Sequence, residues 1–430
     1  MVPSIMNTDS IKTTNYKVVL PFFLYAAISF LVGAILLLTS SEAFQGYYFQ
    51  PHILAITHTM ALGWGTMIIL GAGHQLVPVL IEGKLFSDTL GYISFISAAI
   101  GIPILIYGFY IFDLDTIAKW GAKIVILSFI SFLTNIIISM IQSKKKNVHA
   151  IFVVTATFWL LFTSLFGLIL LYNFKDGILL SISLDYLVVH AHWGIVGWFL
   201  LLVIGVASRL IPLFMISKYN DTKQLWIIFG LINFALILHL FVFNLEDKNI
   251  LLLSPTILVL VAVGLFMKYC YTAYKQRLRK QVDEQVKISL LSVFMLCIPV
   301  IILFFITGIL LLSNTENSKL ILTYGFVIFF GWITAIILGM TFKTMPFVVW
   351  NKVYRKRSVM SKTPSPKDLF NNNIFKIMSI AYIFGFLGFT IGILTSFLIL
   401  LNIGAGLLII TAALYNWNVF KVISHKAKTI

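Results

Sequence analysis

The chain has 430 residues, of which 60% are hydrophobic and only 11% are charged. Soluble domains carry about 25% charged residues, so this composition is typical of a protein that crosses a membrane many times. It excludes a secreted domain, a soluble enzyme and a disordered scaffold. The apolar runs are continuous rather than alternating, which excludes an outer-membrane barrel. The 2 cysteines form no CxxC pair and give no support to a disulfide framework or to covalently attached c-type heme.

Twelve apolar runs are each long enough to cross the bilayer, which takes about 20 residues. They begin near Val18, His52, Thr89, Lys119, His149, Asp185, Gln224, Ile250, Lys287, Lys319, Asn373 and Leu401. The first run, Val18–Thr39, is longer than the core of a signal peptide and lacks a convincing cleavage site, so we expect it to be retained. The sequence therefore predicts an all-α polytopic membrane protein with a single domain over residues 1–430.

The formal net charge is +16, and the charged residues are distributed according to the predicted topology. Basic clusters follow even-numbered runs, at 143–146, 275–280, 352–357 and from Lys421 onwards, whereas the loops after odd-numbered runs carry Asp and Glu. Loops rich in Lys and Arg stay in the cytoplasm, which predicts cytoplasmic termini and insertion in the inner (cytoplasmic) membrane. The basic surplus is thus a topology signal for a lipid bilayer, and we expect no nucleic acid partner.

Three of the predicted helices share one pattern. Residues 56–80, 190–214 and 324–348 align without gaps, and we term these segments the matched helices. At one unvarying offset they share Gly63, Gly197 and Gly331; Trp64, Trp198 and Trp332; Gly71, Gly205 and Gly339; and Pro78, Pro212 and Pro346. Such a repeat predicts three four-helix units, over residues 18–145, 149–279 and 286–424, with three matched helices around a common centre and three clefts between them.

The alignment places polar side chains at two repeated positions near the start of each matched helix. The first position holds Ile56, His190 and Tyr324, and the second holds His58, His192 and Phe326. Two residues of separation turn an α-helix by about 200°, so the two positions face different clefts. The cleft between the first two matched helices then receives His58 and His190 from opposite walls, and the next cleft receives His192 and Tyr324.

An ionisable side chain inside the bilayer is costly and is a functional hypothesis by default. Two neutral imidazoles across a glycine-lined cleft suit a six-coordinate b-type heme, which predicts His58 and His190 as its ligands. His192 and Tyr324 could bind a five-coordinate heme, a His/Tyr-ligated heme, or nothing. The alternative for all the histidines is hydrogen bonding between packed helices.

The remaining histidines carry weaker expectations. His239 has no counterpart in the repeats and is a copper candidate. His74 lies too far along its helix from His58 to share a metal. His149 and His425 stand beside lysines at predicted cytoplasmic helix ends, so we expect them at the membrane interface. No carboxylate falls in the middle of a run, which argues against a proton-driven transporter built on buried Asp or Glu.

The segment 190–198, His-Ala-His-Trp-Gly-Ile-Val-Gly-Trp, resembles the HxH…GW signature of subunit I of the heme-copper oxidase superfamily. The likeness is closest to the cbb-type cytochrome c oxidases and the nitric oxide reductases. Residues 71–78 are similar to the Gly-rich LVP ending of that family's second helix. The resemblance spans the chain at the level of the repeats. It implies a heme-binding protein of respiratory electron transfer or of O2 or NO chemistry.

The chain departs from the family's pattern in its metal ligands. The family carries its HxH signature on the tenth helix, where this chain has Tyr324 and Phe326, and the paired histidines of a copper site are missing from the seventh run. The resemblance therefore implies one heme b on His58 and His190, leaves a second heme and a copper ion open, and does not carry over a complete heme-copper centre. Whether the chain is an enzyme stays open.

The resemblance also implies partners. These are other respiratory subunits and an electron donor such as cytochrome c or a quinol. The twelve-helix heme- and copper-containing proteins of the nitric-oxide stress response fit the same pattern. A heme-free transporter and a structural relative of the oxidase fold are the alternatives from other classes.

Overall fold

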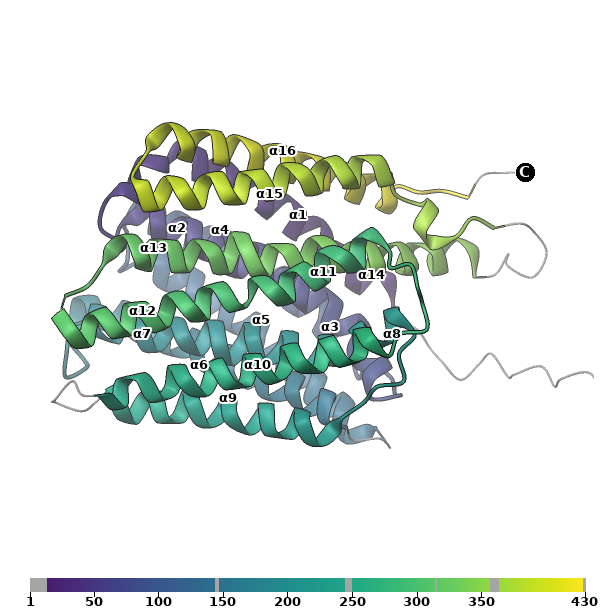
Figure 1. The fold of residues 1–430 in the computed structure, drawn as a ribbon, viewed down its shortest axis with the longest axis horizontal. Helices are drawn as coiled ribbons and strands as arrows, with labels where there is room; N and C mark the ends of the chain where they lie inside the picture. The colour runs from purple at the N-terminus through teal and green to yellow at the C-terminus, as the bar shows by residue number, and fades with distance from the viewer. Residues whose placement is uncertain (1–13, 144–146, 244–249, 314, 356–362, 428–430) are drawn as a thin grey trace, which may run out of the picture.

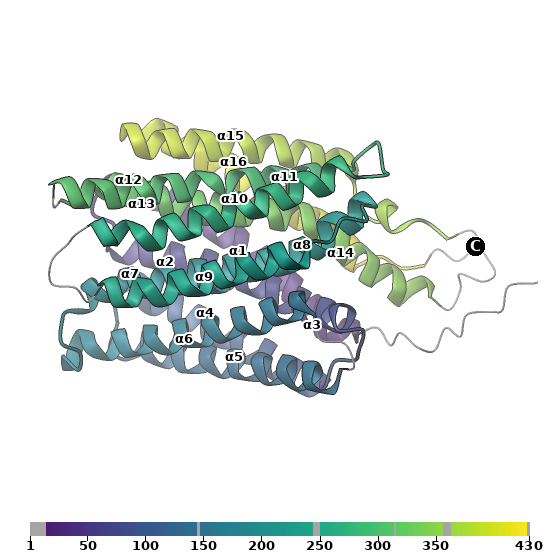
Figure 2. The ribbon, with the colours of Figure 1, turned by 60° about the horizontal axis from the view of Figure 1, so that its bottom comes forward.

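The computed structural model describes residues 14–143, 147–243, 250–313, 315–355 and 363–427 (Figure 1). Within these residues, 12 helical spans are long and apolar enough to cross a membrane, as predicted, and each begins close to its predicted start. The long helices lie side by side along the longest axis of the molecule (Figures 1 and 2). The protein is thus a multi-pass, all-helical membrane protein in a lipid bilayer.

Three spans contain a π-helical segment between two α-helices. The first runs through α2 (Pro51–His58), η2 (Thr59–Thr66) and α3 (Met67–Leu80); the second through α7 (Ser183–His192), η3 (Trp193–Leu200) and α8 (Leu201–Met215); the third through α13 (Ser318–Phe326), η5 (Val327–Ile333) and α14 (Thr334–Tyr354). We term them the central spans. Their π-helical segments begin at Thr59, Trp193 and Val327, which are equivalent positions in the gap-free alignment of the matched helices.

The central spans lie inside the other helices. Within the most apolar 18 residues of each central span, 72%, 78% and 78% of the residues are buried, against 56% or less in the other nine spans. The surrounding helices are α1 (Tyr16–Thr39), α4 (Asp88–Tyr110), α5 (Ile117–Gln142), α6 (Val148–Asp176), α9 (Thr222–Phe243), α10 (Leu253–Lys275), α11 (Glu284–Met295), α12 (Cys297–Ser313), α15 (Asn372–Thr395) and α16 (Leu398–Ile423). A helix that is apolar all round belongs inside a bundle or in lipid, and the central spans take the inner position.

The repeated glycines let each central span approach a neighbouring helix closely. A Cβ atom on Gly71 would lie 2.7 Å from the Cβ of Phe22 on α1, and one on Gly205 would lie 2.4 Å from the Cβ of Phe152 on α6. A Cβ on Gly339 would lie 2.6 Å from a backbone carbonyl of α11. Only glycine fits at these contacts, as expected for small residues where membrane helices pack.

Hydrogen bonds between buried side chains join the central spans to one another. The indole of Trp64 donates to the hydroxyl of Thr334 at 3.0 Å, and the indole of Trp198 donates to the hydroxyl of Thr66 at 3.0 Å. The equivalent of Thr66 and Thr334 in the second span is Leu200, which has no hydroxyl, so the pattern is made twice rather than three times. Each bond satisfies an indole that would otherwise be buried without a partner.

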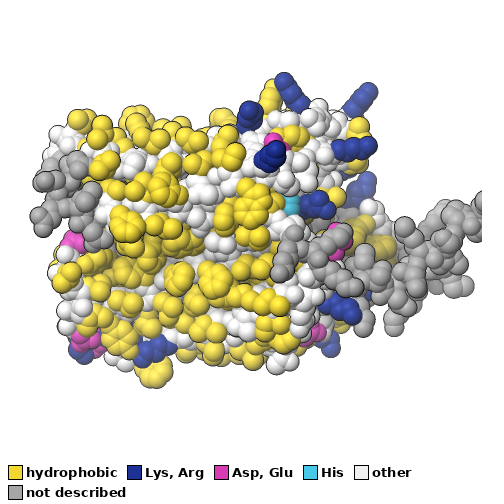
Figure 3. All heavy atoms as spheres, turned by 90° about the horizontal axis from the view of Figure 1, so that it is seen from below, with side chains coloured by type: hydrophobic (Ala, Val, Ile, Leu, Met, Phe, Trp, Pro, Cys, Tyr) yellow, Lys and Arg dark blue, Asp and Glu magenta, His cyan; other side chains and the backbone are white. Residues whose placement is uncertain are grey.

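The two ends of the bundle differ in charge. One end, here termed the basic end, carries Lys218, Arg277, Arg279 and Lys352 and gathers most of the Lys and Arg side chains at the right of Figure 3. The opposite, acidic end carries Glu42, Asp113, Asp115, Asp185 and Glu316. Lys352 lies over the ring of Tyr16, and Tyr354 hydrogen-bonds His425, so α1 begins and α16 ends at the basic end. Some of the charged loop residues that support the predicted topology lie outside the described residues: Lys144–Lys146, Glu246, Asp247, Lys356 and Arg357.

An ion pair at the basic end predicts a specific acid sensitivity. Burial raises the pKa of Asp283, but the hydrogen bond from Lys343 and the charges of Lys343 and Arg279 outweigh it, so the pKa lies below its ordinary value. A depressed pKa stabilises the fold above the unfolded-state pKa of about 3.9, and this stability is lost as the pH falls through the folded-state pKa. We therefore expect Asp283→Asn to lower the melting temperature at neutral pH.

The two proteins should converge in acid, where Asp283 of the wild type is also neutral. Thermal unfolding over a pH series measures this. Glu284→Gln is the control, because the Glu284 side chain is 42% exposed and its ion pair among the described residues is with Lys287 of its own helix. A difference between Asp283→Asn and the wild type that persists unchanged into acid would contradict the prediction.

Candidate functional site

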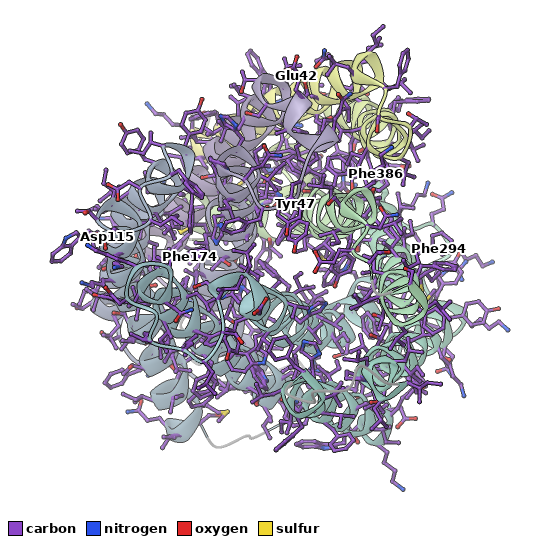
Figure 4. The ribbon with its side chains drawn as sticks, turned by 90° about the vertical axis from the view of Figure 1, so that its left-hand side faces the viewer. Glu42, Tyr47, Asp115, Phe174, Phe294 and Phe386 are labelled. Carbon is purple, nitrogen blue, oxygen red and sulfur yellow. The ribbon has the colours of Figure 1, made fainter. Side chains whose placement is uncertain are left out.

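A cavity of about 1380 Å³ opens between the central spans at the acidic end. Its lining comes from all three central spans and from α4, α5, α6, α9, α10 and α12. Figure 4 looks onto this end, where Tyr47 and Phe174, both part of the lining, lie around the central hollow. The cavity exceeds the roughly 300–1,000 Å³ of a typical small-ligand pocket, so it has room for a large flat cofactor.

His58 and His190 meet in this cavity. Their ring centroids are 6.5 Å apart and their planes are inclined by 26°. His58 stands at the end of α2 with its Nδ1 2.8 Å from the carbonyl of Leu54, and the Nδ1 of His190, on α7, lies 3.1 Å from the carbonyl of Thr163. Both Nδ1 atoms are thus held by backbone acceptors, and neither Nε2 has a hydrogen-bond partner in the described part of the chain. This is the pairing that the repeat alignment predicts.

The spacing of the two imidazoles matches that of two ligands on opposite sides of one heme iron. A metal–imidazole bond is about 2.0–2.1 Å long and the ring centre lies about 1.2 Å behind the nitrogen, so opposed ligands have centroids about 6.4 Å apart. The centroids of His58 and His190 are 6.5 Å apart. The Nδ1 bonds to carbonyl groups leave Nε2 as the donor nitrogen, the arrangement that metal-binding histidines usually have.

His190 depends on a glycine of the neighbouring helix. A Cβ on Gly167 of α6 would lie 2.7 Å from the Cε1 of His190. We therefore expect Gly167→Ala to displace the imidazole, to lower thermal stability by about 1–3 kcal/mol as overpacking does, and to change any ligand spectrum that His190 contributes. Melting curves and absorption spectra measure both effects.

Gly230→Ala on α9 is the matched control, because the added methyl group meets nothing within 4 Å. Equal behaviour of the two alanine variants would contradict the role of Gly167.

A second group of side chains lies further along the same cavity. The Nε2 of His192 is 3.3 Å from the hydroxyl of Tyr324, and its Nδ1 is 2.7 Å from the carbonyl of Val188. The ring of His239, on α9, has its centroid 5.3 Å from that of His192. The Nε2 of His239 is buried without a hydrogen-bond partner among the described residues. The predicted pair of His192 and Tyr324 is therefore joined by a third potential ligand.

The spacing of His192 and His239 suits two imidazoles that bind one metal at a tetrahedral angle rather than from opposite sides. Two imidazoles on one metal at a tetrahedral angle have centroids about 5.2 Å apart, close to the 5.3 Å between His192 and His239. The Tyr324 hydroxyl lies 3.3 Å from the Nε2 of His192, a separation at which both atoms can bind the same metal ion. No cluster of three or more His, Cys, Asp or Glu suited to a metal ion occurs among the described residues, and the potential ligands gathered here are two histidines and a phenol.

The mouth of the cavity is acidic. Asp185 and Glu316 belong to its lining, while the lining residues that the structure describes include no Lys or Arg. The Tyr48 hydroxyl donates to Glu316 at 3.1 Å. Burial, the neighbouring Tyr47 and the charge of Glu316 all raise the pKa of Tyr48, which keeps its hydroxyl protonated at neutral pH. The described lining thus offers no basic side chain that could pair with the carboxylates of a bound heme.

The third cleft has aromatic residues in place of histidines. Phe326 occupies the position of His58 and His192, and its ring stacks on Phe330, Phe386 and Phe389, with centroids 4.5–5.9 Å apart. Such an aromatic cluster fills the space between helices by packing.

The other histidines serve the fold. His149 stands at the start of α6, at a helix end as predicted, but its side chain is buried, with its Nδ1 3.0 Å from the Ser208 hydroxyl and 3.1 Å from the carbonyl of Gly205. His74 is fully buried between Phe22 and Phe132, far from the cavity lining. Position beside a lysine was a poor guide for His149, since its side chain turns inward to α8.

Comparison with known proteins adds no further assignment. No family model matches the chain, and no curated protein matches it.

Proposed function

We propose that this chain is a heme-binding integral membrane protein with one b-type heme held by His58 and His190. The observation that carries the proposal is the 6.5 Å spacing of two imidazoles whose Nδ1 atoms are both engaged by carbonyl groups, inside a cavity large enough for a porphyrin. A bound heme would supply a one-electron redox centre at this place. The two carbonyl groups would fix the orientation of the rings and raise their basicity as ligands.

We place the protein in respiratory electron transfer or in O2 or NO chemistry, on the strength of its resemblance to the oxidase subunit. With both axial positions filled, the His58–His190 site favours electron transfer. Chemistry on a gas requires an open metal position, and His192, His239 and Tyr324 form the group where one would lie. We propose copper or a second heme there, without a complete heme-copper centre.

We infer three four-helix units and a cytoplasmic basic end. Three observations support the units: π-helical segments at equivalent positions of the repeat, three central spans far more buried than the rest, and a glycine contact from each central span to a neighbouring helix. The Lys- and Arg-rich end faces the cytoplasm by the rule that basic loops stay inside. The histidine-lined cavity would then open to the outer side of the inner membrane.

The test is a pyridine hemochrome assay with reduced-minus-oxidised spectra on the purified protein, expressed with ample heme. We expect a b-type spectrum with about one heme per chain, and metal analysis of the same sample reports copper. A heme-free protein would overturn the proposal. The large, mostly apolar cavity would then be the substrate site of a transporter-like protein.

A further inference from the structure

A second, smaller cavity of about 100 Å³ lies between the central spans, away from the histidines. Its lining repeats with the sequence: Ile68, Leu202 and Ile336; Ile69, Val203 and Ile337; Ala72, Val206 and Met340; Gly73, Ala207 and Thr341; and Leu76, Leu210 and Thr344. The members of each trio are equivalent positions of the three matched helices. Because five such positions contribute from all three spans, this cavity lies on the common axis of the central spans, and we term it the axial cavity.

The axial cavity offers water almost no partner. Its lining hydroxyl groups belong to Thr341 and Thr344. Thr341 is hydrogen-bonded to the hydroxyl of Tyr415 at 2.9 Å, and Thr344 donates to the carbonyl of Met340 at 3.0 Å. A buried water needs two to four polar partners, and apolar cavities of this size stay dry and take up apolar molecules such as xenon. The chemistry of the lining therefore selects a small apolar occupant.

One aromatic side chain lines both the axial cavity and the histidine-lined one. Phe199 of η3 belongs to the lining of both cavities. Its repeat equivalents are Gly65 and Ile333, and a Cβ on Gly65 would lie 2.8 Å from the Phe199 ring. The glycine thus makes room for the phenyl ring across the axis. Phe199 is the one residue that the described linings of the two cavities share.

We propose that the axial cavity is a binding site for a small apolar molecule of the size of a diatomic gas, with Phe199 as the partition to the histidine-lined cavity. Its volume excludes a porphyrin or a drug-sized ligand, which need roughly 300 Å³ or more. This site goes beyond the proposed heme function and does not depend on it, because no histidine lines the axial cavity.

The experiment uses xenon as the probe. Crystals of the full chain, pressurised with xenon, are expected to show an anomalous peak between Ile69, Val203 and Ile337. Ala207→Leu, which fills the cavity from α8, should abolish the peak. Ala413→Leu is the matched control, because the same atoms are added on an exposed position of α16, and it should keep the peak. If Ala207→Leu does not fold, Ala72→Val reduces the cavity from α3 by a smaller addition and should weaken the peak.

Phe199→Ala tests the partition. It should extend the xenon density from the axial cavity toward the histidine-lined cavity, while in the wild type the peak stays confined to the axial cavity. Ordered water in the axial cavity, or xenon confined to the histidine-lined cavity, would overturn the proposal. Because the readout needs no heme, a heme-free protein with an axial xenon peak would refute the proposed function and leave this inference standing.

Discussion

Replacing either His58 or His190 by alanine is expected to remove most of the b-type heme from the purified protein. Each imidazole would supply one of two ligand bonds, and no cluster of three or more His, Cys, Asp or Glu among the described residues offers a substitute. The ring closest to His58 in its printed contacts, that of Phe109 with its centroid at 4.4 Å, cannot bind a metal. Loss of a metal ligand should cost more than the 10–100-fold in affinity that loss of its supporting partner costs. We expect heme per chain to fall at least about tenfold in either variant, measured by pyridine hemochrome against protein concentration.

His74→Ala is the matched control for both variants. His74 is on the same central span and is fully buried, whereas His58 is half-buried. The Nδ1 of His74 lies 2.7 Å from the carbonyl of Leu70, as that of His58 lies 2.8 Å from the carbonyl of Leu54. It lies outside the cavity, so its loss should lower stability and leave heme content unchanged. Equal heme loss in His74→Ala would trace the effect to misfolding, and full heme retention in His58→Ala would refute the ligand assignment.

Much of the fold follows from local sequence because a membrane simplifies the problem. A backbone that crosses lipid must satisfy its own hydrogen bonds, so an apolar run of sufficient length becomes a helix. The starts of the spans, from Val18 to Leu401, could therefore be predicted within a few residues. The repeated glycines also mark close helix contacts, because Gly71, Gly205 and Gly339 leave no room for a side chain there.

The meeting of His58 and His190 could be predicted for a more particular reason. The prediction used the rotation of a regular α-helix, whereas the central spans turn into π-helix. Each π-helical segment begins one residue after the second repeated position, at Thr59, Trp193 and Val327. The two positions therefore still lie in regular α-helix, and the turn of about 200° between them holds. A π-helical segment placed one turn earlier would have broken the argument.

The structure adds features that have no local signal. His239 lies far beyond His192 in the chain, on a helix that is not one of the matched helices, and only the packing of α9 against the second central span brings the two rings together. The π-helical segments have no recognised sequence signature here. Phe199 and the axial cavity arise where three spans meet, so they depend on tertiary packing that periodicity does not encode.

His239→Ala is expected to remove metal from the second group while leaving the heme of His58 and His190 in place. The side chain contributes a buried Nε2 with no other partner among the described residues, so its removal deletes a ligand without breaking a hydrogen bond. We expect copper retained after dialysis to fall at least about tenfold, as for loss of a direct ligand. Tyr324→Phe, which removes only the hydroxyl 3.3 Å from His192, should lower copper retention less.

The control for this variant is His149→Ala, which removes another buried histidine, one bonded to Ser208 and absent from the cavity lining. Metal content per chain, hemochrome and carbon monoxide difference spectra separate the outcomes. Copper lost only in His239→Ala, with the b-type spectrum intact, would assign separate roles to the two histidine groups. Copper retained in full would show that His192, His239 and Tyr324 do not hold this metal. If heme disappeared together with copper, the two histidine groups would form a single site in the shared cavity.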